Sequence, residues 1–480
     1  MRHGRAGRDG VVPGGRCLRP HRPIPSRLVV AVVLLLLSSG AATGCSVGSV
    51  GSVGSVGSVG TADSVGGEPS ATAPAGRETS QPVDTAERTA AASALMAQRA
   101  AAVGTHDKRA WLATVADPAS AFASDQSSVF DRMARLPVGR YGEQSLQAGP
   151  PLDAAQRQRY GATAWVASVR IAYQLTGFDH GLRTVDTSYV VTRTPVGWRL
   201  AGITGPGDAQ PWDLSPLTVL RSPSTLVVGN APESTLRSYL TMADAAHARI
   251  AAVWGTAVPS VVVAPKDARD LVEQLHRSAD AGLDQVAAVT DGPLEPGHVA
   301  AGDRVYVNPT AFAGLSDAGR REVVTHELTH VTVRATTTQA VPLWLSEGFA
   351  DHVGYATVAL PPRTIAAALL TQVRAGHGPT QLSSDADFDP ATGAIATAYT
   401  ASWLAVERMA ARYGEPRVVA FYRAVADTAD TADTADTANT ANTAPADAAT
   451  RTARAFPAAL GVSEQAFTAD WVASLQALAR

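Results

Sequence analysis

Cysteine is nearly absent from this chain of 480 residues, which holds only Cys17 and Cys45. Cys17 lies in an N-terminal segment that we expect to be removed, so the remaining chain cannot form an intramolecular disulfide. Cysteine is thereby excluded as a metal ligand and as a nucleophile, and stability must come from apolar packing. Hydrophobic residues make up 45% of the sequence, and the length suits two folded domains.

An excess of basic charge is missing as well, because 40 Lys and Arg stand against 43 Asp and Glu. Residues 1–44 contain seven Arg and one acid, which leaves 33 basic and 42 acidic residues in the rest of the chain. This balance argues against nucleic acid as a partner. The many Ala, Gly and Arg beside few Lys resemble an actinobacterial composition.

The apolar run from Leu28 to Leu37 is too short to favour a lasting transmembrane helix. Several arginines precede it, and small residues follow it up to Gly44. This order is typical of an export signal, so residues 1–44 are predicted to be a signal peptide.

The small residues before Cys45 resemble a lipoprotein lipobox, although Ala42 stands where leucine is more common. The resemblance implies that Cys45 becomes the lipid-modified first residue and holds the protein at the outer face of the cell membrane. An ordinary cleaved signal with an incidental Cys45 is the alternative, and the protein would then be secreted.

A low-complexity segment follows, with five Ser-Val-Gly copies over residues 46–60. Residues 45–84 are rich in Gly, Pro, Ser and Thr, which favours a flexible tether behind the lipid anchor. Repeat expansion without function would give the same pattern.

Residues 85–205 form the first predicted folded region, with an α+β pattern. Helical patterns come first, followed by alternating strands at Trp165–Tyr173, Ser188–Thr192 and Gly197–Ala201, the last two joined by a hairpin turn. This order resembles the nuclear-transport-factor-2-like cone fold. No catalytic set of residues is visible here, so we expect a binding or positioning role.

Residues 206–480 form the second predicted region, also α+β. Strands and helices alternate up to about residue 308, and the remainder is helical. A triplet repeat of Asp/Asn-Thr-Ala at residues 427–444 is predicted to be an exposed loop.

The most informative motif is H-E-x-x-H, formed by His326, Glu327 and His330. Two histidines four residues apart lie on one face of a helix, where both rings can reach one Zn²⁺. Glu327 lies beside the metal and can accept a proton from a metal-bound water. Two histidines satisfied inside an apolar core are the plain alternative.

Catalytic zinc needs a third protein ligand, and Glu347 is the candidate. Pro342 is well placed to open the helix that carries it. Asp351 lies one turn after Glu347 and is expected to accept the spare N–H of a ligating histidine, His326.

The pair H-E-L-T-H and W-L-S-E-G-F-A-D resembles the gluzincin metallopeptidases, the thermolysin-like group, and especially the peptidase MA-like domains. The resemblance implies one Zn²⁺ held by His326, His330 and Glu347, with Glu327 as general base. It also implies an edge strand that pairs with extended substrate. We expect Arg304–Asn308 to be that strand.

An oxyanion-stabilising donor is also implied by the resemblance. Tyr399 is the first candidate, because it is expected to open the downstream helix, and His352 and Tyr355 are runners-up. A packed aromatic is the plain interpretation of Tyr399.

The sequence therefore predicts a zinc-dependent metallopeptidase that hydrolyses peptide or protein substrates at the outer face of the membrane. A catalytically inactive surface lipoprotein, with a peptidase-like scaffold that binds a ligand or partner, is the alternative. No G-A-M-E-N-type element is recognisable, so aminopeptidase activity is not predicted.

Overall fold

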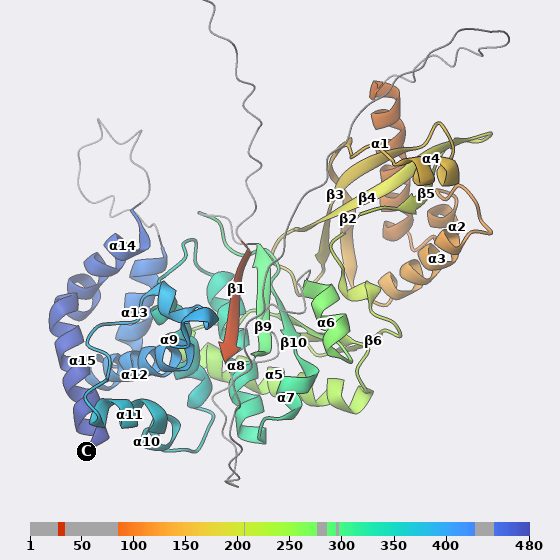
Figure 1. The fold of residues 1–480 in the computed structure, drawn as a ribbon. Coiled ribbons are helices and arrows are strands. Elements are labelled where there is room, and N and C mark those ends of the chain that lie inside the picture. Colours follow the sequence, from red (N-terminus) through yellow and green to blue (C-terminus); the bar gives the residue numbers. More distant parts are fainter. Residues whose placement is uncertain (1–26, 34–84, 206, 276–285, 294–296, 428–445) are drawn as a thin grey trace, which may run out of the picture.

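The computed structural model describes residues 27–33, 85–205, 207–275, 286–293, 297–427 and 446–480 (Figure 1). The fold is α+β, as predicted, with two sheets and many helices. The expected lipid site at Cys45, the tether and nearly all of the triplet-repeat loop lie outside the described residues.

The first region places helices beside a four-stranded antiparallel sheet with the order β2-β3-β4-β5. Its elements are α1 (Thr85–Gly104), α2 (Lys108–Leu112), α3 (Ala121–Met133), β2 (Val138–Ala148), α4 (Ala154–Tyr160), β3 (Trp165–Leu175), β4 (Arg183–Thr194) and β5 (Gly197–Ile203). The predicted hairpin is confirmed, since Thr194 pairs with Gly197. Strand β2 was not predicted, because its polar and glycine residues show no regular alternation and none of them is buried.

The second region is built on a six-stranded sheet with the order β1-β9-β10-β8-β7-β6. Its strands are β1 (Arg27–Val33), β6 (Thr218–Arg221), β7 (Thr225–Gly229), β8 (Ser260–Ala264), β9 (Val286–Pro293) and β10 (Arg304–Val307). Strand β1 comes from the segment predicted to be an export signal and pairs antiparallel with β9.

The prediction that Arg304–Asn308 is an edge strand is wrong. Strand β10 pairs with β9 on one side and with β8 on the other, so it lies inside the sheet. Every residue of β10 is buried, which is the burial of an interior strand. On this side, β1 is the edge strand of the sheet, and β9 lies between β1 and β10 (Figure 1).

The two faces of this sheet bury different partners, because successive side chains of a strand point to opposite faces. Val227, Val262 and Val305 belong to the core beneath the helices of the second region. Their chain neighbours Val228 and Val263 belong instead to an apolar cluster that continues into the first region. The two regions therefore share a core.

Helices fill the rest of the second region. They are α5 (Glu233–Trp254), α6 (Ala268–Leu275), α7 (Pro309–Ala313), α8 (Asp317–Arg334), α9 (Leu343–Tyr355), α10 (Pro362–Ile365), α11 (Ala367–Arg374), α12 (Ile395–Tyr413), α13 (Glu415–Ala426), α14 (Ala448–Ala455) and α15 (Glu464–Ala479). Among the described residues, none of the helices is long and apolar enough to cross a membrane.

Candidate metal centre

Helix α8 carries the H-E-x-x-H motif. Its N-cap is Ser316, whose side chain accepts a hydrogen bond from the Gly319 backbone N–H. Helix α9 begins directly after Pro342 and packs against α8. The helix pair brings His326, His330 and Glu347 together.

Three ligand atoms meet at the contact between these helices. The Nε2 atoms of His326 and His330 are 2.9 Å apart, and the Glu347 Oε2 atom lies 3.3 Å from the first and 3.5 Å from the second. Ligands about 2.0–2.1 Å from a tetrahedral zinc ion are about 3.3 Å from one another. The three side chains thus have the spacing of a metal site, and they form a buried group that could hold one ion.

The Glu347 carboxylate supports this interpretation. It is 1% exposed, and its contacts with the two histidine nitrogens lack the geometry of well-formed hydrogen bonds. A buried carboxylate with such weak hydrogen bonding is costly, whereas a cation between the three ligands would satisfy it. Burial opposes ionisation, but His330 and His326 lower the pKa of Glu347 to about 2, so it carries a negative charge.

Asp351 makes the contact expected of it. Its Oδ1 atom lies 2.7 Å from His326 Nδ1, which fixes the ring so that Nε2 faces the other two ligand atoms. The Ser346 hydroxyl lies 3.5 Å from His330 Nδ1. Burial opposes protonation of His326, yet Asp351 and Glu347 raise its pKa well above the usual value in the absence of a metal.

Glu327 is fully buried beside the ligands, where its carboxylate accepts a hydrogen bond from the Thr290 hydroxyl. Its other oxygen, Oε1, has no hydrogen-bond partner. Burial raises the pKa of Glu327 to about 7. A carboxylate with a pKa near neutrality is suited to accept and return a proton.

The three candidates for an oxyanion donor lie in different surroundings. The Tyr399 ring lies 6.5 Å from the His326 ring, and its pKa is raised by burial and by Glu347. Tyr399 lies inside α12 rather than at its first residue. Tyr355 packs on Trp403, at 4.8 Å between ring centroids.

His352 is not available for that role. Its two ring nitrogens lie 2.7 Å from a Glu407 oxygen and 3.2 Å from a Glu415 oxygen. The residue is also buried. Tyr399 therefore remains the best-placed donor of the three.

Glu322 was not identified from the sequence, although it lies one turn before His326 on α8. Glu322, His326 and Asp351 form a second buried group of acidic and histidine side chains. Burial and the neighbouring Asp351 raise the pKa of Glu322 to about 8, so it is protonated at neutral pH. Helical spacing from His326 was the signal that could have found it.

Glu322→Gln should make the metal-free protein more stable at alkaline pH. Between its usual pKa of 4.5 and about 8, Glu322 binds a proton only in the folded state, so its contribution to stability falls as pH rises through this window. Glutamine does not titrate. With chelator present, the melting temperature of the variant relative to wild type should be roughly 5 °C higher at pH 9 than at pH 6. The same difference in melting temperature between variant and wild type at pH 6 and pH 9 would contradict the assigned protonation of Glu322.

Comparison with protein-family models, with curated proteins and with solved structures gives no match to this chain.

Proposed function

We propose that this protein is a zinc-dependent metallopeptidase with a thermolysin-like catalytic domain, exported and held outside the cell membrane through Cys45. The observation that carries the proposal is the ligand triangle of His326, His330 and Glu347, whose three ligand atoms meet inside a buried setting. The Glu327 carboxylate lies next to this triangle with one oxygen free. A histidine pair that served only packing would not need either carboxylate.

His326, His330 and Glu347 would hold the ion. When bound, zinc would polarise the scissile carbonyl and lower the pKa of a water molecule. Glu327 would accept a proton from the attacking water and pass it to the leaving amine. Asp351 keeps His326 in the required tautomer. Tyr399 is proposed as the hydroxyl that donates to the developing oxyanion.

Strand β1 suggests how an extended peptide would lie in this site. It runs antiparallel to β9, with Val30 opposite Thr290, and it contacts α8 and α12 (Figure 1). These helices carry the motif and Tyr399. We propose that processing before Cys45 removes β1 and leaves the edge of β9 free to pair with substrate, the strand-addition mode of peptide binding.

Removing residues 1–44 should therefore raise activity. A tethered strand competes with substrate at an effective concentration in the millimolar range, so we expect kcat/KM to increase about tenfold or more. Peptide hydrolysis by residues 45–480 and by the full chain, at equal zinc content, measures this. Val30→Pro in the full chain should give part of the increase, because it weakens the strand pairing. Equal activity of all three proteins would rule out competition by β1.

The proposed function is tested by measuring bound zinc and hydrolysis of casein and of a peptide library by residues 45–480. We expect one zinc per chain and activity that a chelator abolishes and zinc restores. Absence of stoichiometric zinc would refute the proposal. Zinc without hydrolysis would favour the alternative of an inactive scaffold that binds a partner.

A further inference from the structure

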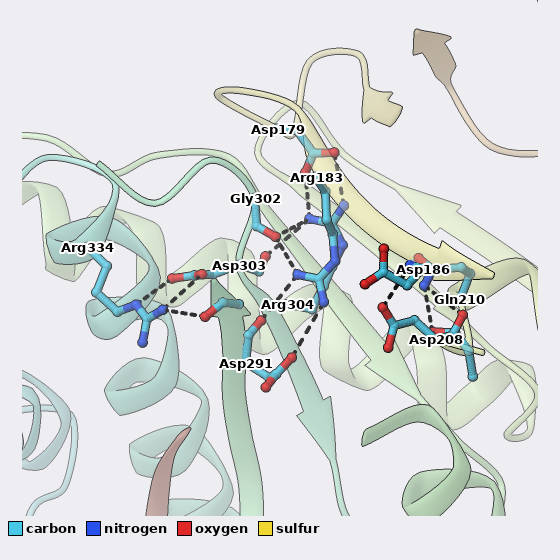
Figure 2. A network of polar contacts seen from close by, with 12 residues as sticks. Asp179, Arg183, Asp186, Asp208, Gln210, Asp291, Gly302, Asp303, Arg304 and Arg334 are labelled. Atoms are coloured by element: carbon cyan, nitrogen blue, oxygen red, sulfur yellow. Dashed lines mark hydrogen bonds and ion pairs between the residues drawn. The ribbon is translucent and has the colours of Figure 1, made fainter. Parts of the chain in front are cut away.

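Three buried ion pairs connect the first region, strands β9 and β10, and the end of the motif helix (Figure 2). Arg183 of β4 faces Asp291 of β9, Arg304 of β10 faces Asp179, and Arg334 of α8 faces Asp303. Figure 2 shows the pairs following one another across the junction. All six side chains are at most 8% exposed.

Each arginine also binds backbone carbonyls or a second carboxylate oxygen. Arg183 donates to the Gly302 carbonyl at 2.9 Å and lies 3.5 Å from Asp291 Oδ2. Arg304 binds both oxygens of Asp179. Arg334 donates to the Gly292 carbonyl at 3.0 Å.

Breaking such a pair leaves a buried charge without compensation, so the pairs hold the junction in one arrangement. The apolar cluster shared by the two regions also holds them in this arrangement. The first region is therefore fixed against the sheet, and Arg183 reaches across to the strand that runs beside the candidate metal centre.

Thr290, the residue before Asp291, connects this strand to the proposed general base. Its side chain is fully buried, and its hydroxyl donates to Glu327 Oε2 and lies 3.2 Å from the Glu327 carbonyl oxygen. With Oε2 engaged, Oε1 is left as the oxygen available to accept a proton. The hydroxyl is the part of this contact that a side-chain substitution can remove.

We propose that Thr290 is a positioning residue for Glu327, and that the first domain, through Arg183 and Asp291, holds the strand that presents Thr290. The first domain is then a permanent part of the catalytic apparatus rather than a separate binding module. This inference rests on the proposed peptidase function, since it assigns a partner to the base of that reaction.

The first experiment compares Thr290→Val, which keeps the shape and removes the hydroxyl, with Thr290→Ser, which keeps the hydroxyl. A carboxylate displaced by about 1 Å costs about 10²-fold in rate, so Thr290→Val should lower kcat by about that factor at unchanged KM and zinc content. Thr290→Ser should recover most of kcat. Wild-type kcat in Thr290→Val would overturn the role of Thr290.

A readout that does not depend on activity is the crystal structure of the metal-free Thr290→Val protein. We expect the Glu327 carboxylate to leave its wild-type position, and an unmoved carboxylate would overturn the inference even if no substrate is found. Inactive wild type would instead refute the proposed function, so the two failures are distinguishable.

The second experiment compares Arg183→Ala with Arg170→Ala, a matched control on the same sheet. Arg170 makes an exposed ion pair with Asp186 at 2.8 Å, which contributes little to stability. At a temperature where both variants are folded, Arg183→Ala should lower kcat about tenfold or more. Arg170→Ala should keep the wild-type value. Equal kcat in the two variants would overturn the role of the first domain.

Discussion

Glu327→Gln should keep its zinc and lose its peptidase activity. The amide has nearly the same shape as the carboxylate but cannot accept a proton, and general-base catalysis contributes about 10²–10⁴-fold to rate. Glu327 lies beside the three ligand atoms without being one of them, so the metal content should stay at one per chain. Zinc analysis together with kcat for a peptide substrate measures both effects.

The matched control is Glu407→Gln, which changes a half-exposed carboxylate that binds His352 outside the ligand group. It should retain both zinc and activity. Full activity in Glu327→Gln would remove this residue from the base role, whereas loss of zinc would mean that its carboxylate is needed for metal binding.

Glu347→Ala should abolish stoichiometric zinc binding. The substitution leaves two histidines, which are too few for a catalytic zinc site, and it removes the negative charge that would compensate the ion in a buried setting. Zinc affinity measured by competition with a chelator should fall by more than the about 10–100-fold expected for Asp351→Ala, which removes only the support of His326.

The order of these two losses is the informative result. If Asp351→Ala weakened binding more than Glu347→Ala, the acidic group around Glu322 and Asp351 would be the better candidate for the ion. If neither variant changed the affinity, zinc would be bound elsewhere and the proposed centre would be wrong.

Local features of the fold were predictable because they depend on short-range spacing. Helix α9 begins directly after Pro342, as predicted, and the predicted hairpin pairs Thr194 with Gly197. His326 and His330 meet because residues one turn apart share a helix face. The contact between Asp351 and His326 was predicted from the same periodicity, combined with the family resemblance.

Strand pairing was less predictable, since it joins residues that are distant in the chain. Arg304–Asn308 reads as a good strand, but its neighbours β8 and β9 come from separate segments, and they make it an interior strand. Strand β2 was missed because its pattern does not alternate, although pairing with β3 stabilises it.

The sequence by itself determined how His326, Glu327 and His330 lie relative to one another, because the residues of one helix have fixed relative positions. Only the tertiary structure decided what surrounds them. It placed Thr290 against Glu327, buried Glu322 beside Asp351, and joined the two regions through Arg183 and a shared core. These contacts depend on how sheets and helices pack, and the packing energy of distant segments leaves no periodic signal in the chain.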